Sequence, residues 1–176
     1  MGKSGSGKSA LVEMFCNNNY TANKFTQVVS YTTRPKRSTT ETGHIFINKD
    51  ELDKYFHDIV AYTVYNNNYY FATTEQVNKA DFYVIDPAGV KFFKEKYNGP
   101  KNTYIIYINV NAFTRFKRML SRGDSFFKAL KRIIIDAFLF RGFKHKADLV
   151  VCNNKDIITA YRKIKSAIYE DNNYRE

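Results

Sequence analysis

The chain has 176 residues, of which 44 % are hydrophobic and 16 % aromatic, so it is long and apolar enough for one folded domain and is not a disordered chain. There is no apolar run of membrane-spanning length, no basic-then-apolar leader at the N-terminus and no metal-ligand spacing of the cysteines Cys16 and Cys152, which together predict a cytoplasmic protein with reduced thiols. The net charge of +11 favours an anionic partner, whether nucleotide, nucleic acid or acidic lipid, without choosing between them.

The first predicted element is a phosphate-binding loop at residues 2–9. Its sequence, Gly-Lys-Ser-Gly-Ser-Gly-Lys-Ser, fits the pattern G-x-x-x-x-G-K-[ST] without a mismatch. Three glycines let the backbone turn its N–H groups inward: Gly2, Gly5 and Gly7. Lys8 is expected at the β- and γ-phosphates of a nucleotide, and the Ser9 hydroxyl on Mg²⁺. The alternative is a flexible Gly/Ser-rich N-terminus, but a plausible helix follows at once, as the motif requires.

Strands and helices then alternate along the chain. The predicted strands are 27–31, 44–47, 82–86, 103–110 and 148–152, and the further predicted helices are 49–56, 90–97, 112–120, 126–140 and 156–169. This alternation predicts an α/β fold with a parallel sheet flanked by helices. Residues 59–65 and 69–73 flank an Asn triplet as a hairpin would, so the stretch from about 31 to 73 is expected to be a β-rich excursion from the main sheet.

Two stretches are basic. Arg34 and Arg37 follow a predicted strand three residues apart, and guanidinium forks bind phosphate oxygens in pairs, although an ordinary basic turn has the same composition. Residues 111–146 hold ten basic residues against Asp124 and Asp136, a local balance of +8. The basic residues are Arg115, Lys117, Arg118, Arg122, Lys128, Lys131, Arg132, Arg141, Lys144 and Lys146. This stretch is either an anion-attracting surface or a merely solvated cationic face.

Four pieces in order make the chain resemble the guanylate kinase family of nucleoside monophosphate kinases. They are residues 2–9, Ser30–Arg37, Asn68–Tyr70 before Thr73, and Asp86–Gly89, and the resemblance spans about residues 2–167. It implies one domain, 1–176, with a P-loop three-layer fold. The core would be 1–30 and 74–176, the nucleoside monophosphate (NMP)-binding excursion about 31–73, and the helical lid about 121–133. The family's first strand would precede Gly2, so we expect that strand to be missing before residue 2.

The same resemblance implies the site residues. ATP would be bound by Gly2, Gly5, Gly7, Lys8, Ser9 and Asn153, the last beside the adenine. Mg²⁺ would be held by Ser9 and Asp86. The acceptor monophosphate would be held by Ser30, Arg34, Arg37 and Tyr70. The catalytic residues would be Lys8, Arg34, Arg122 and, allowing one deleted residue, Arg132.

The chain departs from the family where the base is read. Guanylate kinases place a Glu and an Asp at the positions of Ala61 and Val84, and His44 stands near the position of a phosphate-binding Tyr. An unpaired buried N–H costs about 1–3 kcal/mol, so losing both carboxylates would remove most guanine selectivity. The polar side chains that could read the base instead are Ser30, Thr63, Tyr65 and Glu75.

The sequence therefore predicts an ATP- and Mg²⁺-dependent kinase of (d)GMP or another (d)NMP. Two alternatives remain open at this point. One is a catalytically inactive guanylate-kinase-like module that binds a phosphorylated peptide, and the other is a basic P-loop ATPase acting on nucleic acid. The expected partners are small nucleotides, with neither nucleic acid nor membrane, and the oligomeric state is not predicted.

Overall fold

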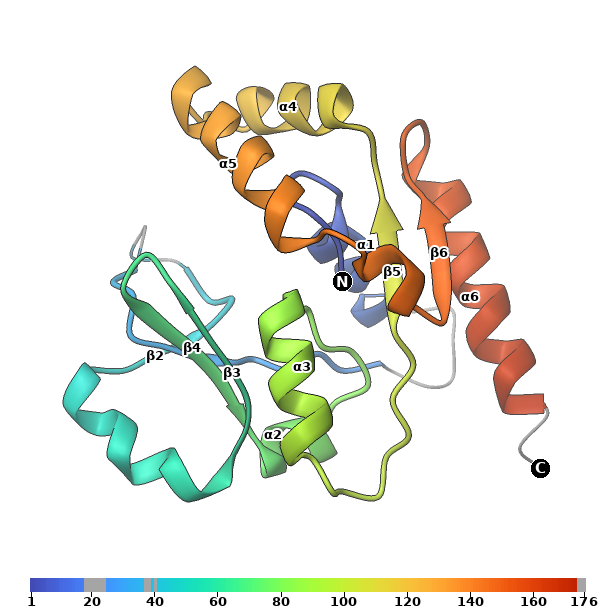
Figure 1. Cartoon of the computed structure of the whole chain (residues 1–176). Helices are drawn as coiled ribbons and strands as arrows, with labels where there is room; N and C mark the ends of the chain where they lie inside the picture. The colour runs from blue at the N-terminus through green and yellow to red at the C-terminus, as the bar shows by residue number, and fades with distance from the viewer. Residues whose placement is uncertain (18–24, 37–38, 40, 174–176) are drawn as a thin grey trace. The chain divides into compact units, whose positions relative to one another are not determined.

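The computed structural model describes residues 1–17, 25–36, 39 and 41–173. The chain divides into two compact units, Met1–Asn18 with Thr103–Glu176, and Asn19–Asn102 (Figure 1). The expected lid, 121–133, lies inside the first unit, and the expected excursion, 31–73, lies inside the second. Each unit is described by itself below.

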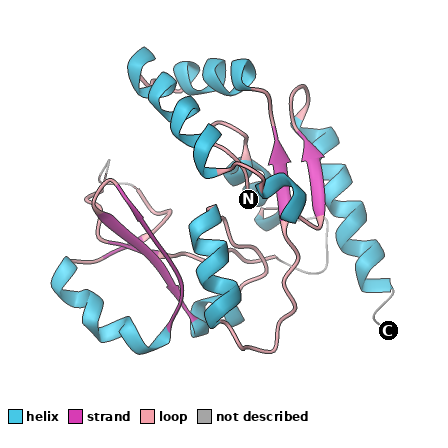
Figure 2. Ribbon diagram, in the orientation of Figure 1, coloured by secondary structure: helices cyan, strands magenta, loops and turns pink. Residues whose placement is uncertain are grey.

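The first unit is built on two parallel strands. Strand β5 (Ile106–Asn109) pairs with β6 (Leu149–Cys152), with Ile106 opposite Leu149 (Figure 2). The helices of this unit are α1 (Lys8–Cys16), α4 (Ala112–Ser121), α5 (Phe126–Leu139), the 3-10 helix η2 (Phe143–Lys146) and α6 (Ile157–Asn173). Phe15 of α1 meets Tyr161 of α6 with ring centroids 4.4 Å apart, and α4 packs along α5. These elements confirm the strand–helix alternation predicted for residues 103–169.

Residues 1 and 2 pair with the free side of β5. The Ile108 amide donates to the Met1 carbonyl over 2.8 Å, and Gly2 forms a parallel bridge with Ile108. The described chain thus runs directly from a position beside β5 into the phosphate-binding loop.

The second unit holds a four-stranded sheet in the order β2-β1-β4-β3. The strands are β1 (Tyr31–Thr32), β2 (Ile45–Phe46), β3 (Ile59–Tyr65) and β4 (Asn68–Thr73). Strands β1 and β2 are parallel, whereas β4 runs antiparallel to both of its neighbours. The predicted hairpin is confirmed, and its turn residues Asn66 and Asn67 have φ of 49° and 58°, values that Asn tolerates better than most residues.

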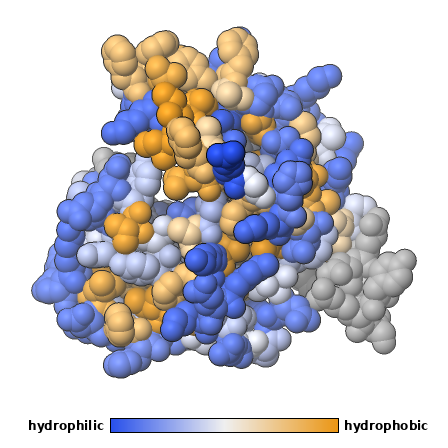
Figure 3. Space-filling view, in the orientation of Figure 1, coloured by the Kyte–Doolittle hydropathy of each residue, from blue (hydrophilic) through white to orange (hydrophobic). Residues whose placement is uncertain are grey.

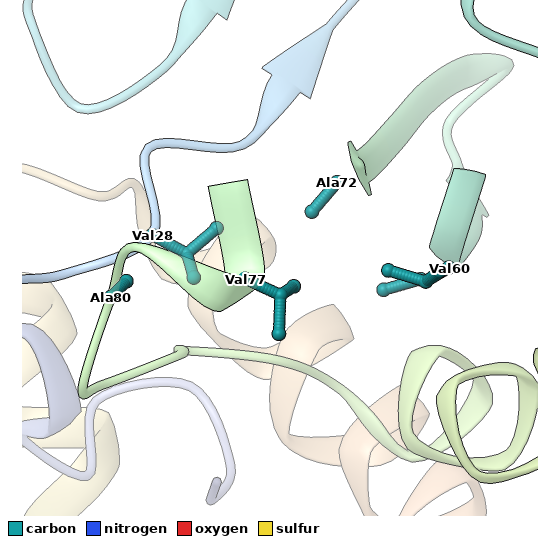
Figure 4. Close-up of a cluster of buried hydrophobic side chains, with 6 residues drawn as sticks. Val28, Val60, Ala72, Val77 and Ala80 are labelled. Atoms are coloured by element: carbon teal, nitrogen blue, oxygen red, sulfur yellow. The ribbon is translucent and has the colours of Figure 1, made fainter. Parts of the chain in front are cut away.

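Helices and a small apolar core complete the second unit. The helices are the 3-10 helix η1 (Lys49–Asp58), α2 (Thr74–Asn78) and α3 (Pro87–Lys96). The core contains Val28, Val60, Ala61, Ala72, Val77 and Ala80, contributed by β3, β4, α2 and the segments beside them (Figure 4). Helix α2 was not predicted, although Thr73 and Gln76 form the capping box that marks its start.

The predicted strands 27–31 and 82–86 are shorter in the structure. They lie side by side in the parallel sense, but only Gln27 and Phe82 form a bridge, and β1 begins at Tyr31. The chain leaves this pairing because Asp86 caps α3 by accepting from the Gly89 amide, and Pro87, which has no N–H, is the first residue of that helix. Among the described residues, no helix is long and apolar enough to cross a membrane.

Candidate functional site

The phosphate-binding loop of the first unit wraps so tightly that two of its positions require glycine. Gly5 and Gly7 have φ of 73° and 85°, in the left-handed region. A Cβ at Gly5 would lie 2.8 Å from the Arg115 carbonyl oxygen, and a Cβ at Gly7 would lie 2.7 Å from Nδ2 of Asn153. The loop therefore has the close backbone turn that a phosphate cradle needs, ahead of the N-terminus of α1.

A buried ion pair from α4 and α5 holds the loop. Asp136 Oδ2 accepts from the Ser4 amide over 2.6 Å, and Arg115 Nη1 donates to the Ser4 carbonyl over 3.3 Å. Arg115 and Asp136 are 3.2 Å apart, and their side chains are only 3 % and 10 % exposed. Sequence reasoning missed this pair because it counted both residues among the charges of a basic surface. The available signal was Asp136 itself, a lone acid within the apolar run of α5.

Asn153 binds the same loop from the end of β6. Its Nδ2 donates to the Ser6 carbonyl over 2.9 Å, and its side chain is buried. The amide thus touches the loop backbone from inside the unit. The contact with adenine stays a prediction.

Lys8 lies folded over the loop, with Nζ donating to the Lys3 carbonyl over 3.1 Å. Burial lowers the pKa of Lys8 to about 8; Asp136 opposes this shift, and the charges of Arg115 and Arg122 add to it. Two predicted catalytic residues, Lys8 and Arg122, are therefore close enough to influence each other electrostatically. Ser9 follows as the second residue of α1 and is exposed.

Asp124 brings together the two predicted lid arginines. Its Oδ2 accepts from Arg122 Nη2 over 2.6 Å and lies 3.6 Å from Arg132 Nη1, while Lys128 Nζ is 3.7 Å from Oδ1. Against the effect of burial, the hydrogen bond from Arg122 and these positive charges lower the pKa of Asp124. No role was predicted for Asp124, because its position two residues after Arg122 puts a carboxylate within reach of that side chain without showing that the two pair.

In the second unit, Glu41 holds the predicted acceptor residue Arg34. Both guanidinium Nη atoms reach this carboxylate, Nη2 to Oε1 over 2.8 Å and Nη1 to Oε2 over 3.2 Å. Hydrogen bonding to Glu41 raises the pKa of Arg34 against the effect of burial, and Tyr70 contributes in the same direction. Arg34 and Tyr70 are therefore neighbours, and their part in holding a monophosphate stays a prediction. Arg37 lies outside the described residues.

A pocket of about 200 Å³ lies beside these residues in the second unit. It is lined by Ser30, His44, Tyr62, Thr63, Tyr65, Tyr70, Tyr83, Val84, Ile85, Asp86 and Gly89. Ser30 Oγ and His44 Nδ1 are 3.0 Å apart. The one carboxylate in this lining, Asp86, accepts from the Thr63 hydroxyl over 2.9 Å and from the Gly89 amide over 2.7 Å.

Three of the four residues considered as readers of a base line this pocket. Ser30, Thr63 and Tyr65 line it, whereas Glu75 pairs with Lys79 on the surface of α2. Val84 lines the pocket with an apolar side chain, and Ala61 is fully buried. The walls thus offer hydroxyls, an imidazole and aromatic rings, and their carboxylate is already hydrogen-bonded.

Within residues 1–17, 25–36, 39 and 41–173, no cluster of three or more His, Cys, Asp or Glu side chains could hold a metal ion. This does not conflict with a Mg²⁺ role, because Mg²⁺ is usually bound by one or two protein oxygens together with substrate phosphates and water. The exposed Ser9 hydroxyl beside the loop fits such a site. Asp86 lies in the other unit, and its part in metal binding stays a prediction.

Comparisons with known proteins agree with the motifs. The family model described as Guanylate kinase matches residues 1–171. A guanylate kinase of Wigglesworthia glossinidia brevipalpis is 30% identical over 186 residues, covering 96% of this chain and 84% of that protein. The crystal structure of guanylate kinase from Anaplasma phagocytophilum matches with a TM-score of 0.65 at 17% identity, covering 97% of this chain and 82% of that one. The structural match shows a shared fold and confirms the predicted α/β P-loop class.

Proposed function

Since this chain belongs to the guanylate kinase family, we propose that it is an ATP-dependent nucleoside monophosphate kinase. It transfers the γ-phosphoryl group of ATP to (d)GMP or another (d)NMP. The observation that carries the proposal is the complete phosphate-binding loop, whose glycines have the required conformation and whose Lys8 lies over the cradle. An inactive binding module would not need an intact loop of this kind.

On the donor side, the loop amides and Lys8 bind the phosphates, and Gly2, Gly5 and Gly7 allow the backbone its close approach. The Ser9 hydroxyl supplies the protein oxygen for Mg²⁺, which when bound neutralises phosphate charge. Asn153 holds the Ser6 carbonyl of the loop through its Nδ2. It is also expected to lie beside the adenine. The Arg115–Asp136 pair fixes Ser4 in the same loop.

On the acceptor side, Arg34, Arg37, Tyr70 and Ser30 hold the monophosphate. Support comes from Arg34, whose guanidinium already binds the Glu41 carboxylate with both Nη atoms. A phosphate presents the same pair of oxygens to that fork. Asp86, which resembles the acid by the family's Mg²⁺ and phosphate cleft, also anchors Thr63 in the pocket wall.

Arg122 and Arg132 stabilise the charge of the phosphoryl group during transfer and help to exclude water. Asp124 supports both assignments, because it holds the two guanidinium groups at one carboxylate. In-line transfer requires little covalent chemistry from the protein. Positioning and charge neutralisation are the tasks assigned to these residues.

The test is a coupled assay with MgATP and a panel of ribo- and deoxyribonucleoside monophosphates. We expect turnover with at least one of them, and the pocket walls favour a broader choice of base than a pair of free carboxylates would allow. Absence of turnover with every monophosphate, in a protein that still binds ATP by calorimetry, would refute the kinase and favour a binding module. Stimulation of ATP hydrolysis by RNA or DNA would favour the nucleic-acid ATPase instead.

The pKa of Lys8 leads to a prediction for ATP binding. In the free protein this pKa is about 8, and the phosphates need the charged form, so affinity should be level below pH 8. Above that pH, binding must take up a proton, and the affinity should fall by up to about tenfold per pH unit. Calorimetry in two buffers of different ionisation heat measures both the affinity and the proton uptake. Lys8→Arg is the matched control, because its charge does not titrate. The same slope in that variant would contradict the assignment.

A further inference from the structure

The outer surface of α4 and α5 exposes many large apolar side chains. On α5 these include Phe127, Leu130, Ile134 and Phe138, whose spacing of three and four residues places them along one face of the helix. Phe127 is 81% exposed and Phe138 73%, whereas Ala129 and Asp136 are buried on the opposite side. The buried side already packs in the unit, so this second apolar face has no role in its core.

Aromatic contacts extend this face from α5 to α4. Phe116 of α4 meets Phe126 of α5 edge-to-face, with ring centroids 5.3 Å apart, and Phe126 in turn meets Phe127 at 5.7 Å. Phe113 of α4 is 68% exposed. Hydrophobic residues accordingly gather over α4 and α5 in the space-filling view (Figure 3). We call this surface, with its basic flanks, the α4–α5 face.

The charges around the apolar stripe are positive. The exposed lysines of α4 and α5 are Lys117, Lys128 and Lys131, and the exposed cations Arg141, Lys144 and Lys146 follow α5 in the sequence. Residues 111–146 contain only two acids, and neither balances these cations fully. Asp124 is shared by three cations, and Asp136 is buried with Arg115. Whatever covers this face must accept both apolar side chains and an excess of positive charge.

We propose that the α4–α5 face binds an anionic lipid surface, with α5 lying in the plane of the interface. An apolar stripe flanked by Lys and Arg is the pattern of interfacial helices, in which the apolar side chains enter the acyl boundary and the cations meet acidic headgroups. A second copy of the chain fits less well, because two such faces would bring like charges together. The inference does not depend on the kinase activity.

The test is sedimentation of the full chain with vesicles of phosphatidylcholine alone and of phosphatidylcholine mixed with phosphatidylglycerol. We expect binding to the mixed vesicles at about 0.1 M salt and at least tenfold weaker binding at about 1 M. The triple variant Phe127→Ser, Ile134→Ser, Phe138→Ser should bind at least about tenfold more weakly. Lys117→Glu with Lys131→Glu should weaken binding to the anionic vesicles. Phe56→Ser, at a position that is 68% exposed in η1, is the matched control and should bind as wild type.

Three results would overturn the proposal. The first is failure of the wild-type chain to bind the anionic vesicles. This holds even if the chain binds an acidic protein. The second is equal binding by the triple variant and the wild type. The third is a dimer that the triple variant dissociates while vesicle binding is absent. ATP binding and thermal melting of every variant report whether it is folded.

Discussion

Replacement of Lys8 by alanine is expected to lower kcat/KM for phosphoryl transfer by at least about 10²–10³-fold. The Lys8 ammonium is the charge that we place at the transferring phosphate. The alanine cannot restore this charge, and water must reorient to stabilise the phosphate, whereas the fixed ammonium is already in place. The measurement is steady-state kinetics with MgATP and the best acceptor of the substrate panel.

Lys3→Ala is the matched control, because Lys3 belongs to the same loop and contributes only its backbone carbonyl to Lys8. Its kcat/KM should stay within a few-fold of wild type. Lys8→Ala should fold normally, since burial disfavours the charged amine that it removes. Comparable activity of Lys8→Ala and wild type would remove Lys8 from the mechanism.

Asp136→Ala is expected to reduce the free energy of unfolding by about 3–5 kcal/mol. The substitution leaves Arg115 buried without its counter-ion and deprives the Ser4 amide of its acceptor. An uncompensated buried charge and an unpaired buried N–H both destabilise the folded state. Urea unfolding followed by circular dichroism measures the change, and ATP affinity should fall with it because Ser4 lies in the loop.

The double variant Arg115→Met, Asp136→Ala separates the charge effect from the loss of contacts. It should be more stable than Asp136→Ala alone, because no unpaired guanidinium remains inside. Asp124→Ala is the matched control, because Asp124 lies in the same two-helix segment and its main partner, Arg122, is half exposed to solvent. It should cost at most about 1 kcal/mol. A loss for Asp136→Ala no larger than that of Asp124→Ala would show that the buried pair does not stabilise the loop.

The parts of the fold that could be predicted are those encoded locally. The loop at residues 2–9, the hairpin around Asn66 and Asn67 and the helices 112–121 and 126–139 each carry their own glycines, turn residues or apolar periodicity. Strand 82–86 was overestimated because an apolar run reports burial without reporting a hydrogen-bonding partner. Its extent depends on residues 26–28, far away in the sequence.

The candidate site divides in the same way. Lys8, Arg34 and Arg122 could be proposed from their motifs, but the carboxylates that hold the two arginines, Glu41 and Asp124, could not. Each partner is short-range in sequence, yet nothing in the local pattern says which of several charges it will choose. Arg115 and Asp136 were harder still, because both meet Ser4, more than 100 residues away.

The hydrogen bonds of Arg115 and Asp136 to Ser4 also attach helices α4 and α5 to the phosphate-binding loop. Arg115 lies near the start of α4 and Asp136 near the end of α5, so both contacts with Ser4 are made at one end of the helix pair. Arg122 and Gly123 lie at the other end, in the connection between α4 and α5. Gly123 has φ of 93°, in the left-handed region, and a Cβ built there would meet no atom within 4 Å. A displacement of Arg115 or Asp136 would therefore also displace Ser4 in the phosphate-binding loop.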